Sequence, residues 1–294
     1  MSSLHRVAVV QPHTYARTWG RIFPFPFDDN TPPESRNLDD ALRYVDQAAQ
    51  GGARYVAFPE MYPGPMSVDS PLTLDSVTEA LAAQARRSRV WVLYGGAEVT
   101  PNGLYNTYNV LNPSGGLAGR YRKMIPACGE PWLPGDEPLV VEADGLRLGL
   151  AVCWEAWFPE IARTLAFLGA DVIFFPTGAL IYELAPRWRE ILAARAAENL
   201  VYTAASVNLL AMEDGMAVIH SPEGPIAASA GPGIIFGDVD AERLAYLRRT
   251  DEQLIVPKKY RSIPGLMRAL RPDLLHKLQS YVTEAMSAKT QEGG

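Results

Sequence analysis

The chain of 294 residues is poor in cysteine, with two, and in histidine, with four. Two cysteines, Cys128 and Cys153, are too few for a disulfide framework, so any thiol chemistry is either catalytic or incidental. The four histidines are far apart and form no motif with the close spacing of metal ligands. The sequence therefore gives no support for a metal site.

The chain also lacks an excess of basic residues and any apolar run long enough to span a bilayer. The net charge is -6 and the Lys and Arg residues are scattered, which argues against a nucleic-acid partner. The first residues contain no apolar segment of the length found in signal peptides. We therefore expect a cytoplasmic protein that acts on a small molecule and has no membrane partner.

What the sequence does contain is a regular alternation of strand and helix patterns. Residues 7–11 and 54–60 are predicted strands, and the predicted helix between them begins with a cap at Asn37 and ends at Gly51. The alternation continues to about residue 209, and short strands joined by Gly- and Pro-rich turns follow to residue 240. These patterns predict one α/β domain whose sheets mix parallel and hairpin-connected strands.

Two segments do not fit the alternation. Residues 12–35 form a long Pro- and aromatic-rich connection, which is either a functional lid or a surface loop packed by its own aromatic side chains. Residues 251–294 form a C-terminal tail that contains an amphipathic helix pattern. We expect a domain over residues 1–250 and a tail that packs on it or on a neighbouring subunit.

Reactive side chains follow three of the predicted strands, at the edge where α/β folds bind ligands. They are Glu60, the basic cluster that ends in Lys123, and Cys153. Each has an ordinary structural interpretation: a helix cap or solvated acid, a solvated strand end, and a small core side chain. For Cys153 the alternative is a strand-to-helix turn, where backbone N–H groups stabilise a thiolate.

Taken together, the motifs FPE at 58–60, YRK at 121–123 and CWEAWFPE at 153–160 resemble the Glu, Lys and Cys motifs of the carbon–nitrogen hydrolase (nitrilase) superfamily, in the family's order. VAVVQ at 7–11, ARAAENLVYTAASVN at 194–208 and LRPDLL at 270–275 extend the resemblance over nearly the whole chain. The resemblance implies a four-layer α-β-β-α sandwich built from two pseudo-symmetric halves. It also implies a homodimer or a higher homo-oligomer.

The chemistry of these residue types fits hydrolysis of a C–N bond. Cys153 supplies a nucleophile, Glu60 a general base and acid, and Lys123 a cation for the thiolate and the oxyanion. The backbone N–H of Trp154 would add an oxyanion donor, and no cofactor is required. The resemblance further implies that Glu130 orients the substrate and the lysine, whereas Cys128 is interpreted as incidental.

The motifs of more than one branch of the family are present. The Cys-Trp-Glu sequence at 153–155 resembles the nitrilases, whereas YRKMIPACGEPWLPG at 121–135 resembles the aliphatic amidases and formamidases. We favour an amidase, with a nitrilase as the alternative. A third branch, the N-carbamoyl-amino acid hydrolases, needs a cation for the substrate carboxylate, and Arg187 and Arg189 are its candidates.

The residues expected to line the substrate pocket favour an uncharged, partly apolar acyl group; they are Trp154, Trp157, Thr177, Gly178 and Tyr182. A non-catalytic binding subunit of the same fold is the alternative of a different class. The intact set of Glu60, Lys123 and Cys153 argues against it, because binding alone would not require all three.

Overall fold

The computed structural model describes residues 4–16, 33–179, 184–210, 215–249 and 271–292, and twelve strands in this part form two six-stranded sheets. The strands of the first sheet, in spatial order, are β12 (Gly233–Asp240), β1 (Leu4–Gln11), β2 (Tyr55–Ala57), β3 (Trp91–Thr100), β4 (Gly103–Leu111) and β5 (Leu117–Arg122). Those of the second are β11 (Gly224–Ser229), β10 (Ala217–Ser221), β9 (Tyr202–Ala205), β8 (Val172–Phe174), β7 (Leu146–Leu150) and β6 (Leu139–Ala143).

The two sheets have the same plan. β1, β2 and β3 run parallel in the first sheet, as β7, β8 and β9 do in the second. Antiparallel strands flank each parallel set. This arrangement agrees with the two similar halves that the sequence resemblance implies.

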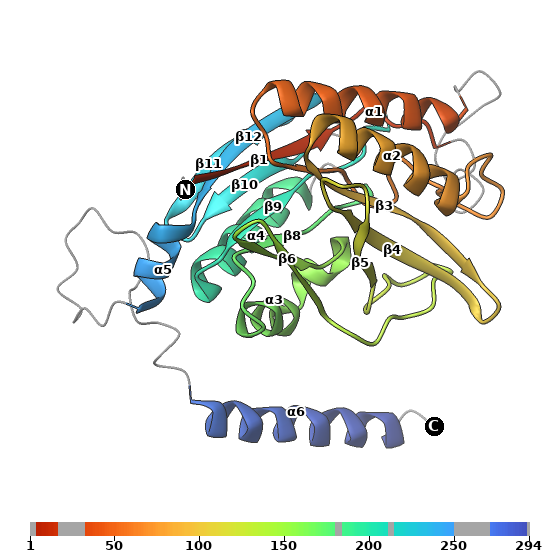
Figure 1. Ribbon diagram of the computed structural model, residues 1–294. Helices are drawn as coiled ribbons and strands as arrows, with labels where there is room; N and C mark the ends of the chain where they lie inside the picture. Colours follow the sequence, from red (N-terminus) through yellow and green to blue (C-terminus); the bar gives the residue numbers. More distant parts are fainter. Residues whose placement is uncertain (1–3, 17–32, 180–183, 211–214, 250–270, 293–294) are drawn as a thin grey trace.

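Helices cover the outer faces of the sheets (Figure 1). α1 (Ser35–Gln50) and α2 (Leu74–Ser88) pack on the first sheet, and α3 (Pro159–Phe167) and α4 (Ala185–Asn199) pack on the second. A third apolar cluster fills the space between the sheets. The predicted α-β-β-α sandwich is therefore confirmed.

The apolar run of β1 follows from its burial on both faces. Val7 and Val9 belong to the cluster between the sheets, whereas Ala8 and Val10 contact the helices of the first layer. A strand that is buried on both faces needs no alternation of polar and apolar residues. This explains why VAVV is continuously hydrophobic.

Two details of the predicted fold are wrong. Asn37 does not cap α1, which starts at Ser35; its buried side chain instead exchanges hydrogen bonds of 2.9 and 2.8 Å with the backbone of Tyr15. The last strand of the predicted meander, β12, leaves the second sheet and pairs with β1 of the first. Local patterns mark the strand but cannot specify its partner.

The last two helices follow the sandwich. α5 (Ala241–Arg249) comes directly after β12, and α6 (Pro272–Glu292) forms in the predicted tail. α6 lies apart from the sandwich in Figure 1 and exposes Leu274, Leu278 and Tyr281. The packing of this tail on another surface stays a prediction. None of the described helices is long and apolar enough to cross a membrane.

Candidate active site

The four predicted catalytic side chains come from segments that follow strands of both sheets. Glu60 lies three residues after the end of β2, and Lys123 lies directly after β5, where its backbone N–H donates to the carbonyl of Asn106 over 2.9 Å. Cys153 begins a short 3-10 helix, η2 (Cys153–Trp157), after β7 of the second sheet. The face-to-face packing of the sheets therefore brings these segments together.

The ammonium of Lys123 joins two carboxylates. Its Nζ donates to Oε1 of Glu60 over 2.9 Å and to Oε1 and Oε2 of Glu130 over 3.1 and 2.9 Å. The backbone N–H of Ala127 donates to the same Oε2 of Glu130 over 2.8 Å. Glu130 is therefore not an exposed loop acid, because its side chain is only 13% exposed and is held by two partners.

Burial sets the charges of this cluster. Burial alone would lower the pKa of Lys123, but Glu60, Cys153 and Glu130 outweigh it and the pKa is raised, so the lysine stays charged. Burial and the neighbouring Glu60 raise the pKa of Glu130, against the opposing effect of Lys123. Two carboxylates therefore share one ammonium. Their negative charges offset the charge of Lys123, which weakens its ability to stabilise a thiolate on Cys153.

Cys153 occupies a strained turn. Its φ of 49° lies in the left-handed region, which non-glycine residues seldom adopt outside constrained sites. The backbone N–H of Cys153 donates to the carbonyl of Pro176 over 2.8 Å, and the backbone N–H of Gly178 donates to its thiol. The predicted strand-to-helix turn is confirmed, although the element that follows is a 3-10 turn and α3 starts only at Pro159.

The surroundings of Cys153 in the free protein favour the protonated thiol over the expected thiolate. Burial, followed by the charge of Glu60, raises the pKa of the Cys153 thiol well above its ordinary value, although Lys123 and the Gly178 N–H act in the opposite direction. The proton must therefore leave the sulfur during the reaction, which requires a base beside it.

Glu155 is a site residue that sequence reasoning interpreted only as a mark of the nitrilase branch. It is fully buried, and its Oε1 accepts hydrogen bonds from the Tyr121 hydroxyl and from the N–H groups of Met124 and Ile125, over 2.7, 2.7 and 3.0 Å. Its Oε2 accepts from the N–H of Val152 over 2.6 Å. The Glu155 side chain thus connects the residues on either side of Lys123 to Val152, the residue before Cys153.

Asn208 is a second residue that the sequence did not single out. Its buried amide donates to the carbonyl of Glu60 over 2.8 Å and to the carbonyl of Gly178 over 2.9 Å, while its Oδ1 accepts from the Thr14 hydroxyl over 2.9 Å. The amide therefore links the segment that carries the general base to the segment that donates to the thiol. Asn208 ends the motif at 194–208, but the motif by itself does not predict these contacts.

The residues predicted to line the substrate pocket are placed as follows. Gly178 lies against the Cys153 thiol, and Thr177, beside it, is fully buried. Trp154 is 36% exposed, and its ring packs on Trp157 with 6.1 Å between centroids. Tyr182 lies outside the described residues. The substrate contacts of all five stay predictions.

The two candidate carboxylate clamps differ. Arg187 is exposed, whereas one guanidinium nitrogen of Arg189 donates to the carbonyl of Gly215 over 3.1 Å and its buried Nε has no partner among the described residues. The remaining cysteine, Cys128, is exposed and free. Within the described chain, neither of these two arginines bonds to Cys153. Cys128 has no partner there either.

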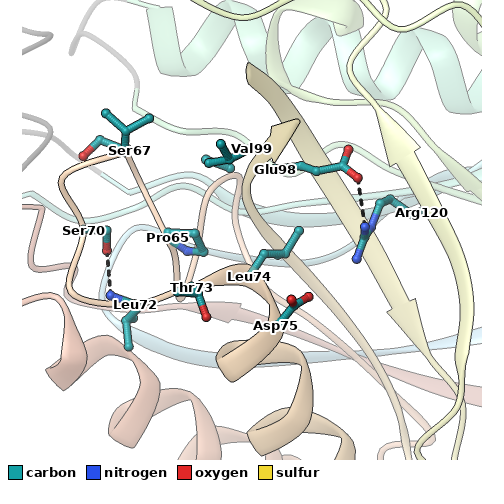
Figure 2. A pocket seen from close by; sticks show the side chains of 12 residues that line it. Pro65, Ser67, Ser70, Leu72, Thr73, Leu74, Asp75, Glu98, Val99 and Arg120 are labelled. Atoms are coloured by element: carbon teal, nitrogen blue, oxygen red, sulfur yellow. Dashed lines mark hydrogen bonds and ion pairs between the residues drawn. The ribbon is translucent and has the colours of Figure 1, made fainter. Parts of the chain in front are cut away.

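A cavity of about 330 Å³ is lined by a different set of residues (Figure 2). Its lining includes Leu74 and Asp75 at the start of α2, Glu98 and Val99 on β3, and Arg120 on β5, which is bonded to Glu98. None of the predicted catalytic residues belongs to this lining. We therefore assign it no part in the chemistry. In the described ranges no group of His, Cys, Asp and Glu side chains could hold a metal ion.

Comparison with known proteins identifies the fold and then the family. A carbon–nitrogen hydrolase from Helicobacter pylori G27 superposes with a TM-score of 0.75 at 19% identity, over 94% of this chain and 98% of that one. The protein thus shares the α-β-β-α sandwich fold of that structure. The family model for carbon–nitrogen hydrolase matches residues 6–249, and the chain belongs to this family of enzymes.

Two curated relatives have names that give an activity. A deaminated glutathione amidase of Synechocystis sp. is 30% identical over 247 residues, which cover 74% of this chain and 91% of the relative. An omega-amidase of Xenopus tropicalis is 30% identical over 258 residues, which cover 79% and 91% respectively. Membership of the carbon–nitrogen hydrolase superfamily, expected from the sequence motifs, is confirmed.

Proposed function

We propose that the protein hydrolyses a small, uncharged carboxamide through a thioester on Cys153 and releases ammonia and a carboxylic acid. The observation that carries the proposal is the buried Lys123 ammonium between Glu60 and Glu130, with the thiol of Cys153 in the same cluster. The names of the two relatives support an amide rather than a nitrile.

The first half of the reaction forms the thioester. Glu60 takes the proton from the thiol of Cys153 while the sulfur attacks the amide carbon. The charge of Lys123 and the backbone N–H of Trp154 in η2 stabilise the oxyanion. Glu60 then gives its proton to the amide nitrogen, the C–N bond breaks, and ammonia leaves.

The second half regenerates the enzyme. Water loses a proton to Glu60 and its oxygen attacks the thioester, after which the C–S bond breaks and the sulfur recovers a proton. Glu130 holds Lys123 in place through both halves by two hydrogen bonds. These steps use only side chains of this chain and need no cofactor.

Ammonia release from matched panels of short amides, nitriles and N-carbamoyl amino acids tests this proposal. We expect turnover of the amides, and Cys153→Ala should reduce it by at least about 10,000-fold because the nucleophile is lost. The matched control is Cys128→Ala, which should keep the wild-type rate because this cysteine is exposed and free.

The other panels define the alternatives. Turnover of nitriles alone would show that the Trp154 and Glu155 signature reports the branch, and turnover of N-carbamoyl amino acids alone would implicate Arg187 or Arg189. Turnover only of charged amides would overturn the assignment of an uncharged acyl group. No turnover in any panel would contradict the proposed reaction. Cytoplasmic location and assembly into a homodimer or a higher oligomer stay predictions.

The protonation state of the free thiol gives a separate prediction. Because the pKa of Cys153 is raised, its thiolate fraction is small at neutral pH and grows as the pH rises. Alkylation of Cys153 by iodoacetamide, followed by mass spectrometry of its peptide, should therefore be slow at pH 7 and accelerate into the alkaline range. The exposed Cys128 is the internal reference. Fast alkylation of Cys153 that is already constant at neutral pH would contradict this prediction and restore the preformed thiolate.

A further inference from the structure

Asn106 on β4 holds the side chain of the general base. The residue is 1% exposed, and its Nδ2 donates to Oε1 of Glu60 over 2.7 Å. Lys123 donates to the same oxygen over 2.9 Å. Within the part of the chain that the structure describes, Oε2 of Glu60 accepts no hydrogen bond. The two carboxylate oxygens of Glu60 are therefore not equivalent.

The oxygen of the Asn106 amide shows that the hydrogen bond to Glu60 determines how this side chain is oriented. Its Oδ1 is buried and has no partner among the described residues. A buried acceptor without a donor is unfavourable, and rotation of the amide by half a turn would merely exchange it for a worse contact, Oδ1 against Oε1 of Glu60. The residue keeps an unsatisfied oxygen in order to present a donor to the ionised carboxylate of Glu60.

We propose that Asn106 is a positioning residue that, with Lys123, holds Oε1 of Glu60 so that Oε2 alone exchanges protons with the reacting groups. The inference rests on the proposed function. In the first half of the reaction, the S–H bond of Cys153 breaks and its proton moves to Oε2; the same proton then passes from Oε2 to the nitrogen that leaves as ammonia. In the second half, a proton of water moves to Oε2 while the hydroxyl oxygen attacks the thioester.

The charged and titratable groups that surround Glu60 set the direction of the effect. Lys123, from the end of β5, favours the ionised carboxylate, whereas Glu130, from the loop after it, and the thiol of Cys153, from η2, do not. Asn106, like Lys123, donates a hydrogen bond to the carboxylate of Glu60. Its removal takes away a hydrogen bond that Oε1 of Glu60 accepts, and leaves Lys123 as the donor to this oxygen.

The experiment is the pH dependence of kcat/KM for the best amide substrate in wild type, Asn106→Ala and Asn106→Asp. We expect the acidic limb to move to higher pH by about 1 unit in Asn106→Ala and further in Asn106→Asp, which places a second carboxylate against Oε1. The pH-independent value should fall by about 10- to 100-fold, mainly through kcat, because the base is misplaced rather than the substrate lost. Asn106→Asp keeps the shape of the side chain but adds a buried carboxylate, so the melting temperature of both variants is measured first and the inference is tested on whichever variant stays folded.

Asn109→Ala on the same strand is the matched control. Asn109 is equally buried, and its side chain bonds to Thr107 and Arg120 but not to Glu60. Its replacement should lower the melting temperature and leave the acidic limb where it is. If Asn106→Ala behaves in the same way, with a lower melting temperature and an unmoved limb, its role is only structural and the inference is wrong.

A direct titration separates this inference from the proposed function. In protein labelled with ¹³C at the glutamate side-chain carboxyl, the resonance of Glu60 is assigned by its loss in Glu60→Gln, and its pKa is read without any turnover. A higher pKa of Glu60 in Asn106→Ala than in wild type supports the inference even if no amide is hydrolysed. An unchanged pKa overturns it even if the amide panel succeeds.

Discussion

Substitution of Lys123 by glutamine is expected to lower amide turnover by at least about 1,000-fold, because the charge that stabilises the oxyanion is lost. It should also lower the free energy of unfolding by about 3–5 kcal/mol, because Glu60 and Glu130 remain buried together without their cation. The Lys123 side chain is 0% exposed, so water cannot take the place of its ammonium unless the surrounding residues move. Ammonia release and urea denaturation measure the two effects.

Two further variants make this expectation specific. Arg122→Gln, one residue earlier, removes a cation that is 42% exposed and paired with Glu98, and should cost less than about 1 kcal/mol. The double variant Glu60→Gln/Lys123→Gln also removes one of the two buried carboxylates that have lost their cation. Part of the lost free energy of unfolding should therefore return, while activity stays absent. A Lys123→Gln protein as stable as Arg122→Gln would refute the buried charge cluster.

Replacement of Glu155 by glutamine has the second large expected effect. The carboxylate accepts from four donors, whereas a glutamine has one acceptor oxygen, and its NH₂ group must face at least one buried N–H. We expect a loss of about 1–3 kcal/mol of stability for each donor left without a partner. Because Glu155 sets the position of Lys123 relative to Cys153, turnover should fall by about 10- to 100-fold.

The control for Glu155 is Tyr121→Phe. This change removes only one of the four donors and leaves the carboxylate in place, so it should cost no more than about 1.5 kcal/mol and have a smaller effect on turnover. Chemical denaturation and ammonia release compare the two proteins. Equal effects of both substitutions would mean that the Tyr121 contact, not the link between the two segments, is what Glu155 contributes.

The features that the sequence predicted correctly are those with local causes. Strands such as VAVVQ are mostly apolar runs, and the first helix has helical periodicity and a Gly stop at Gly51. The turn at Cys153 follows from the same local signals. The proximity of Glu60, Lys123 and Glu130 was expected from ordered motifs at strand ends, and the structure places their charged atoms within hydrogen-bond distance.

The features that the sequence could not predict depend on partners far along the chain. Asn106, Asn208 and Glu155 act through contacts with residues 30 to 148 positions away, and the local sequence around them does not predict these contacts. The thiolate expected at Cys153 was inferred from the turn and from the cation at Lys123. Its pKa is instead governed by burial and by Glu60, which the fold supplies. Side-chain environments of this kind arise only after the two sheets have packed.

The pairing of β1 with β12 bears on how the protein is made. β1 emerges first from the ribosome, yet its eight-residue antiparallel partner, in register from Leu4 with Asp240 to Gln11 with Gly233, is translated near the end of the domain. Until then β1 has an open edge and a fully apolar VAVV run, which are features that favour aggregation during synthesis. A nascent chain that stalls before β12 therefore carries every residue of the proposed reaction, but its apolar strand β1 still has an unpaired edge.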